Sequence, residues 1–150
     1  MRISAEEAKR LIDEKKSYKS KERDNLEILT NDAIKGKVKY SFLSDDGRDE
    51  FLITFERKGI QLDKYTKGLI GARTIPLVRL DIGKPHRNPD GVDVGENHIH
   101  IYREGFDDKW AVEINPKDFP HIEDILQTFY DFLRFCNADN FPKIQKGLFN

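Results

Sequence analysis

Hydrophobic residues alternate with polar ones along much of the chain, mainly between residues 38 and 82 and between residues 98 and 114. In one such stretch, Phe51, Ile53 and Phe55 are separated by single residues, a spacing that is typical of a strand with one buried face. Turn sequences interrupt the pattern at Asp45-Asp46-Gly47 and at Lys58-Gly59, where glycine accepts backbone angles that other residues avoid. The pattern therefore predicts antiparallel strands joined by short turns.

Two segments near the ends of the chain have apolar residues at helical spacing instead. Ser4 followed by Glu7 matches a capping box and predicts a helix from about Ala5 to Lys16. Asp118 and Pro120 suit the first turn of a second helix. Its apolar face consists of Ile122, Ile125, Leu126, Phe129, Leu133 and Cys136. This wide face predicts that the second helix packs across the core side of the sheet.

Together these patterns predict an α+β fold. We expect a twisted, largely antiparallel sheet of about five or six strands, with the N-terminal and C-terminal helices packed on one face. The 150 residues suit a single domain spanning 1–150, because a chain of this size buries about 70% of its unfolded surface. Residues 15–24 are interpreted as a basic linker and residues 139–150 as a C-terminal tail.

The last predicted hairpin joins the strands on either side of a four-residue turn from Gly105 to Asp108. Counting back from this turn sets His100 opposite Glu113. Alternation then assigns the core face, under the C-terminal helix, to Ile99, Ile101, Trp110, Val112 and Ile114. The opposite, solvated face is expected to carry His98, His100 and Tyr102.

Composition and charge describe an ordinary soluble protein. The 26 basic and 27 acidic residues give a net charge of −1, which offers nucleic acid no general attraction. No apolar run approaches the roughly 20 residues of a membrane span, and the N-terminus lacks the apolar segment of a secretory signal. Because Cys136 is the only cysteine, no intramolecular disulfide is expected. A reducing cytoplasm fits these features best.

One segment has a local basic excess, which makes nucleic acid a candidate partner. Its basic residues are Lys15, Lys16, Lys19, Lys21 and Arg23. The alternative is a solvated helix end followed by a linker, which we favour because the segment has Tyr18 as its one aromatic residue.

The densest candidate chemistry lies between Lys84 and Glu104, which holds three of the four histidines. Asn88-Pro89-Asp90-Gly91 predicts a tight turn. After it, His98 and His100 alternate with isoleucine, so their side chains lie about 6.6 Å apart on one face of a strand. His86 or a carboxylate would complete a site for a divalent metal. The alternative is that both histidines simply occupy a wet face.

A wider set of residues forms the predicted binding face. It consists of His86, Arg87, Asp90, His98, His100, Tyr102, Glu104 and Glu113. We expect this face to bind a protein partner, with Glu113 within reach of His100.

Other chemistry has less support. The chain has no P-loop, no dinucleotide-binding glycine fingerprint and no nucleophile elbow, so a divalent metal is the one cofactor that we consider. The Gly-x-x-Gly spacing within Lys67–Gly71 is interpreted as a turn. Cys136 is interpreted as a buried structural thiol, because no neighbouring base or cation would activate it.

Two metal-dependent families share fragments of the histidine motif. His98-Ile99-His100 with Glu104 resembles the first metal motif of cupins, which bind a metal inside a barrel, although Ala111 stands where a glycine is usual. The same three residues resemble the motif of single-strand endonucleases of rolling-circle replication. That resemblance implies a nucleophilic tyrosine on a later helix, which would be Tyr130; the alternative is an aromatic residue at a packing edge.

A third resemblance covers more of the chain. The sequence H-R-N-P-D-G, followed by N-H-I-H-I-Y-R-E-G-F-D-D-K-W-A, spans His86 to Ala111 and is similar to small bacterial proteins of unassigned function from prophages and other mobile elements. This resemblance implies a bacterial setting and no particular catalytic residue.

The sequence thus favours a small cytoplasmic interaction protein, such as a regulator or inhibitor encoded by a bacterial mobile element. The competing hypothesis is a metal-dependent nuclease or phosphoesterase that uses His86, His98 and His100. The interaction protein is favoured because catalysis normally needs several converging groups, whereas only the histidine face offers even two at defined geometry.

Overall fold

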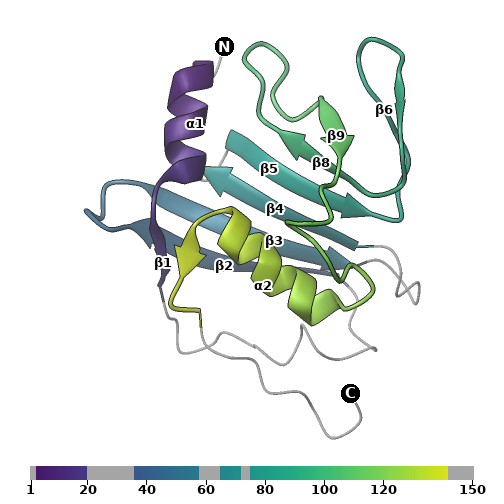
Figure 1. The fold of residues 1–150 in the computed structure, drawn as a ribbon. Helices are drawn as coiled ribbons and strands as arrows, with labels where there is room; N and C mark the ends of the chain where they lie inside the picture. The colour runs from purple at the N-terminus through teal and green to yellow at the C-terminus, as the bar shows by residue number, and fades with distance from the viewer. Residues whose placement is uncertain (1–2, 20–35, 58–64, 72–74, 142–150) are drawn as a thin grey trace, which may run out of the picture.

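The computed structural model describes residues 3–19, 36–57, 65–71 and 75–141 (Figure 1). Within them, eight strands form one sheet in the order β10-β1-β2-β3-β4-β5-β8-β9. Neighbouring strands are antiparallel except for the parallel pair β1 and β10. The strands are β1 Lys16–Tyr18, β2 Gly36–Ser44, β3 Glu50–Arg57, β4 Tyr65–Gly71, β5 Ile75–Ile82, β8 His98–Ile101, β9 Ala111–Glu113 and β10 Ala138–Asp139. The predicted α+β class is confirmed, with short strands extending the sheet at both edges.

The central strands form the predicted meander. The turn at Asp45–Gly47 joins β2 to β3: Gly47 has a φ of 73°, and its N–H donates to the carbonyl of Ser44 at 2.9 Å. The interpretation of Lys67–Gly71 as a turn is wrong, since these residues belong to β4 and Leu69 is fully buried. The predicted turn at Lys58-Gly59 lies outside the described residues.

Two helices pack on the same side of the sheet (Figure 1). Helix α1, Ala5–Asp13, begins as predicted at Ser4, whose hydroxyl accepts from the N–H of Glu7 at 3.1 Å. Helix α2, Ile125–Phe135, begins later than predicted: Asp124, rather than Asp118, is its N-cap and accepts from Gln127. The main core lies between α2 and the sheet and includes Tyr40, Phe42, Phe51, Ile53, Phe55, Leu69, Leu80, Phe129 and Phe132.

Two sequence-based expectations are wrong at Lys16: the helix does not extend to this residue, and the residue is not solvated. Helix α1 ends at Asp13, and Lys16 begins β1 with 0% of its surface exposed. Its ammonium donates to the carbonyls of Ile12, Glu14 and Cys136 at 2.7–2.8 Å. Lys16 is therefore not a solvated residue of a linker. Lys15 and Lys19 are exposed, whereas Lys21 and Arg23 lie outside the described residues.

The predicted C-terminal tail begins inside the fold. Asp139 pairs with Ser17 in the parallel β1–β10 ladder. Phe141 packs its ring 4.8 Å from that of Tyr18 and 4.9 Å from that of Tyr40. These contacts cover part of the core at the β10 edge.

The β8–β9 hairpin has a different register and a different buried face from those predicted. His98 pairs with Glu113 and His100 with Ala111, a shift of two residues, because the connection runs from Tyr102 to Trp110 and closes on itself through an Arg103–Asp107 bridge. The histidines lie in the interior. On the opposite side Ile99 is buried, but a second set of predicted core residues is only partly buried or exposed: Ile101, Trp110, Val112 and Ile114.

Candidate metal centre

A small hairpin brings the first histidine of the cluster into place. Strands β6, His86–Arg87, and β7, Asp93–Val94, pair around the predicted Asn88–Gly91 turn. In this turn Gly91 has a φ of 84°, and its N–H donates to Asn88 at 2.8 Å. Arg87 bridges Asp93 across the hairpin at 2.8 Å, and this contact raises the pKa of Arg87 and lowers that of Asp93. Both side chains are well exposed, so the bridge adds little stability.

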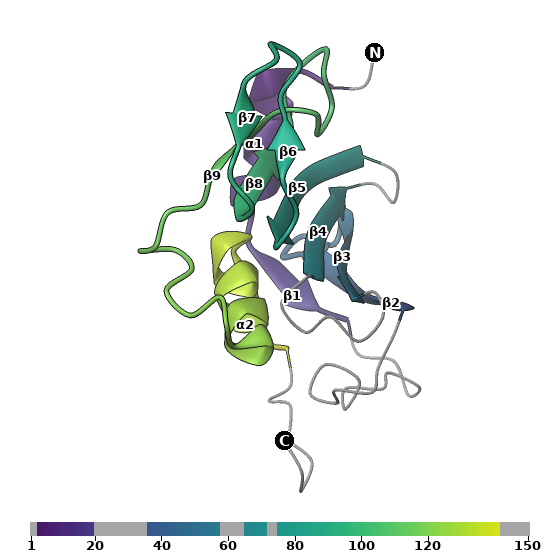
Figure 2. The same cartoon turned by 90° about the vertical axis from the view of Figure 1, so that its right-hand side faces the viewer.

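Asn88 fixes this hairpin to the rest of the fold. Its side-chain amide donates to the carbonyl of Ala111 and accepts from the N–H of Ala111, both at 2.9 Å. The ring of His86 approaches the carbonyl of Lys109, with 2.9 Å between Nε2 and the oxygen. The hairpin lies with β8 and β9 in the upper part of the molecule, away from α2 (Figure 2). These bonds hold His86 beside β8.

The other two histidines project from β8 toward this hairpin. His98 and His100 are 1% and 0% exposed, so the predicted wet face is wrong. They pair with Asp81 and Arg79 on β5, and paired residues lie on the same face of a sheet. Four polar side chains thus share a buried face that the β6–β7 hairpin helps to cover.

The three histidines form a compact cluster. One potential ligand nitrogen from each of His86, His98 and His100 lies within 4.8 Å of the others. The ring centroids of His86 and His100 are 4.5 Å apart, those of His98 and His100 are 4.8 Å apart, and those of His86 and His98 are 5.4 Å apart. The structure therefore brings together the three residues that the sequence singled out.

One carboxylate oxygen links two of these rings. Oδ2 of Asp81 lies 3.3 Å from Nε2 of His98 and 3.2 Å from Nε2 of His100. The other ring nitrogen of His98, Nδ1, contacts the carbonyl of Gly95 at 2.9 Å. An oxygen acceptor opposite the ligating nitrogen is the usual second contact of a metal-bound histidine. His86, with the carbonyl of Lys109, has the same kind of contact.

His100 has an unsatisfied atom. Its Nε2 faces Asp81 and Arg79, but its Nδ1 is buried and has no hydrogen-bond partner within the part of the chain that the structure describes. An unsatisfied buried nitrogen costs free energy.

Several residues of the predicted binding face lie elsewhere. The hydroxyl of Tyr102 donates to the carbonyl of Ile3 at 2.8 Å and accepts from its N–H at 3.0 Å. Glu104 accepts from the N–H of Ala5 at 2.8 Å. Both residues therefore anchor the start of helix α1 instead of joining the histidines.

Two further members of the predicted face are exposed at the margin of the site. Asp90 accepts from the N–H of Val92 within the hairpin turn. Glu113 is exposed and pairs with His98, whereas the sequence predicts His100 as its partner.

The sequence-based reasoning missed Arg79, Asp81 and Asn88 as members of the site. The signal for the first two was available: both are charged residues in a strand whose other members, Val78 and Leu80, are apolar. A charge inside a buried strand indicates a partner on the facing strand. The role of Asn88 as an anchor to β9 depends on tertiary contacts and has no local signature.

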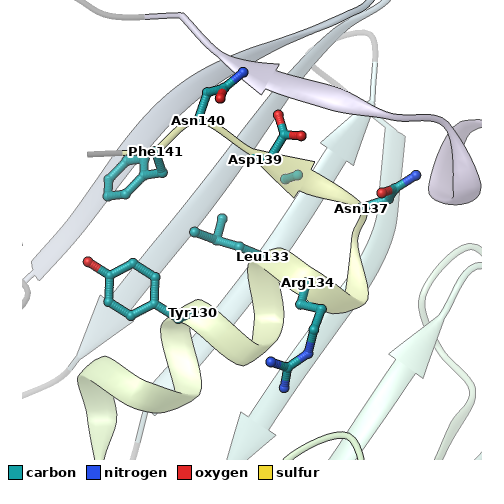
Figure 3. A pocket seen from close by; sticks show the side chains of 8 residues that line it. Tyr130, Leu133, Arg134, Asn137, Asp139, Asn140 and Phe141 are labelled. Atoms are coloured by element: carbon teal, nitrogen blue, oxygen red, sulfur yellow. The ribbon is translucent and has the colours of Figure 1, made fainter. Parts of the chain in front are cut away.

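The two resemblances to metal-dependent families fail on position. Glu104 accepts from the N–H of Ala5 at the start of helix α1, and the described sheet has two edges, β10 and β9, where a cupin has a closed barrel. Tyr130 lies on α2 beside β10, at the sheet edge opposite the one that carries the histidines (Figure 3). It cannot act as a nucleophile in this cluster.

A cavity of about 340 Å³ lies between α2 and β10. Figure 3 shows the side chains that line it. Leu133 and Phe141 form part of its wall. Its polar residues bind elsewhere in the fold: Arg134 pairs with Asp131, and Asp139 accepts from Ser17. This arrangement offers a ligand little polar recognition.

Comparison with known proteins gives a family without a function. A model described as a family of unknown function (DUF6978) matches residues 3–138. No curated protein and no solved structure matches the chain. Within the described residues, neither helix is long and apolar enough to cross a membrane.

Proposed function

We propose that this chain, which belongs to the DUF6978 family of unknown function, is a small interaction protein. A divalent metal would organise its binding surface. The metal ligands are His86, His98 and His100. The observation that carries this proposal is their convergence: one ring nitrogen from each of these three histidines, which come from two separate hairpins, lies within 4.8 Å of the others.

The distances from Asp81 to two of the histidines suit a tetrahedral ion such as Zn²⁺. With zinc–nitrogen bonds of 2.0–2.1 Å, neighbouring ligand atoms of a tetrahedron are about 3.3 Å apart. The distances from Oδ2 of Asp81 to His98 and His100, 3.3 and 3.2 Å, equal this edge. At its widest, 4.8 Å, the histidine cluster must contract by about 1.5 Å. We therefore assign Asp81 as the fourth ligand.

The metal would join two hairpins that carry exposed apolar side chains. Among the described residues, the large hydrophobic side chains that are exposed are Val92, Ile101, Phe106 and Val112. All lie in or between the β6–β7 and β8–β9 hairpins, which the histidines connect. Clustered exposed apolar groups are typical of protein-binding surfaces, whereas single ones are common on any protein. This placement supports a protein partner.

The setting implied by the sequence resemblance belongs to this proposal. A regulator or inhibitor from a bacterial mobile element, acting in the cytoplasm, fits a buried free thiol at Cys136. A nucleic-acid partner at Lys15 and Lys19 is the weaker proposal, because Lys16 is buried.

A metal-dependent nuclease or phosphoesterase is the alternative function. With three protein ligands, a bound divalent ion would supply Lewis-acid chemistry to a substrate. Partial exposure of His86 favours this alternative, whereas ligation by Asp81 would close the site to substrate. Zinc- or manganese-dependent hydrolysis of a phosphodiester, abolished by His86→Gln, would establish the enzyme.

Metal titration tests the main proposal. We expect one equivalent of Zn²⁺ or Co²⁺ to bind, with at least about a tenfold loss of affinity in His86→Gln. His121→Gln is the matched control, because His121 is exposed and pairs with Glu123 outside the cluster. The proposal is refuted if neither the wild-type protein nor the variant Arg79→Met, described below, binds any metal. It is also refuted if His86→Gln binds metal with the same affinity as the wild-type protein.

A further inference from the structure

Arg79, which pairs with His100 across β5 and β8, makes three polar contacts beside the histidine cluster. Its Nε donates to Oδ2 of Asp81 at 3.1 Å, and its Nη1 donates to Asp108 at 2.9 Å. Its Nη2 lies 3.1 Å from Nε2 of His100. The guanidinium therefore contacts the same oxygen and the same nitrogen that a metal would take.

The contact with His100 is informative because a guanidinium can only donate. A hydrogen bond from Arg79 requires a lone pair on Nε2 of His100, and a metal requires that same lone pair. Oδ2 of Asp81 is likewise shared, since it faces both histidines and Arg79. One position next to these atoms thus suits either a guanidinium or a metal ion.

We infer that Arg79 is an internal cation that competes with the metal for Asp81 and His100. This inference rests on the proposed metal site. Metal binding displaces the guanidinium from these two residues, and Arg79 keeps Asp108 as its partner. Two observations allow this movement: the Arg79 side chain is 38% exposed, and Asp108 belongs to the β8–β9 connection, outside the cluster.

The competition regulates the site. In the metal-free protein Arg79 neutralises Asp81, so the buried carboxylate is not left unpaired. A metal ion must displace Arg79 from Asp81 in order to bind. The free-energy cost of this displacement lowers the apparent affinity of the metal. The site is thereby suited to reversible loading with a divalent ion, and Arg79 sets the concentration at which loading occurs.

Zinc affinity, measured by competition with a chromophoric chelator, tests this inference. We expect Arg79→Met to bind Zn²⁺ about ten- to a hundredfold more tightly than the wild-type protein. Arg79→Lys, which keeps the charge without the planar fork, should lie between them. Arg48→Met is the matched control: it removes the same charge from an exposed site outside the cluster, where Arg48 pairs with Asp46. Thermal unfolding checks that each variant is folded.

A second measurement follows Arg79 directly in the wild-type protein. Zn²⁺ should shift the ¹⁵Nε signal of Arg79 and increase its exchange with solvent, while the signal of Arg48, which pairs with Asp46 outside the cluster, stays unchanged. This readout remains decisive if Arg79→Met fails to fold.

The outcomes separate the two proposals. Tighter binding by Arg79→Met supports the inference, even if the wild-type protein binds no zinc. Equal affinities, or an unchanged Arg79 signal in zinc-loaded protein, overturn it and leave the metal site intact. Absence of zinc binding in both proteins overturns the metal site itself.

Discussion

The ammonium of Lys16 donates to the carbonyl of Cys136 at 2.7 Å, and neither side chain is exposed to solvent. This bond joins the start of β1 to the end of α2, two segments separated by 120 residues. Further bonds to Ile12 and Glu14 tie the end of helix α1 to the same point. One buried cation thus holds three elements together.

Burial gives Lys16 a pH-dependent contribution to stability. Desolvation lowers the pKa of Lys16 from 10.5 to about 8. The unfolded chain therefore binds this proton more tightly, and the contribution, about 3 kcal/mol, is present above pH 10.5 and lost as the pH falls through 8. We expect the free energy of unfolding in urea to rise by about 1 kcal/mol from pH 8 to 9. Lys16→Met should abolish the rise; an equal rise in that variant would contradict the assignment.

Cys136 opposes this effect at higher pH. Burial raises the pKa of its thiol from 9.0 to about 12. Its contribution is therefore present below pH 9 and lost as the pH rises toward 12. The two effects should roughly cancel between pH 9 and 10.5. In Cys136→Ala the free energy of unfolding should continue to rise to pH 10.5, which the same urea series will measure.

The sequence predicted the fold class, the meander and the cluster of histidines, because these depend on local periodicity and spacing. It predicted the wrong environment for His98 and His100. Alternation identifies which residues share a face, but both faces of β8 are covered near the histidines, one by the β6–β7 hairpin. On the histidine face of β8, the buried polar and charged groups pair with one another. The alternating pattern of the sequence does not distinguish such a buried polar face from a solvent-exposed one.

The register of the β8–β9 pair could not be predicted from the local sequence, for a related reason. The count from Gly105 assumed a simple hairpin turn, whereas Gly105 and Asp107 both have positive φ, and the connection closes through its own bridge at Arg103. Asn88 then fixes β9 from outside the hairpin. Tertiary hydrogen bonds therefore set this register, and they have no signature in the local sequence.

A comparison of two aromatic residues tests the location of the core. Phe132 is fully buried, whereas Trp110 is partly exposed and packs between Phe106 and Arg103. Phe132→Ala should lower the free energy of unfolding by about 3–5 kcal/mol through cavity formation. Trp110→Ala should cost about 1 kcal/mol. Similar losses in the two variants, measured by urea unfolding, would mean that Trp110 belongs to the core after all.

Tyr102 should prove important for the docking of helix α1. Its hydroxyl makes two hydrogen bonds to the backbone of Ile3. Tyr102→Phe keeps the buried ring and removes both bonds, so we expect a loss of about 1–3 kcal/mol. Amide hydrogen exchange should increase in Ala8 and Leu11 more than in β3. Unchanged protection of helix α1 would show that its apolar contacts suffice.

Replacing Asn88 should affect zinc affinity more than it affects the stability of the fold. Its side chain makes both hydrogen bonds that hold the β6–β7 hairpin to Ala111, yet it contributes nothing to the main core. Asn88→Ala should therefore free the hairpin and move His86 away from the other two histidines. Because an outer residue that positions a ligand typically affects metal affinity ten- to a hundredfold, zinc binding should weaken by about that factor. Core stability should change by about 1–2 kcal/mol, since one partly buried amide is lost.

Chelator competition and urea unfolding measure the two effects on one protein. Asp90→Ala is the control, because Asp90 lies in the same turn and accepts from the N–H of Val92 within it. Equal zinc affinity in Asn88→Ala and the wild-type protein would show that His86 does not depend on this anchor.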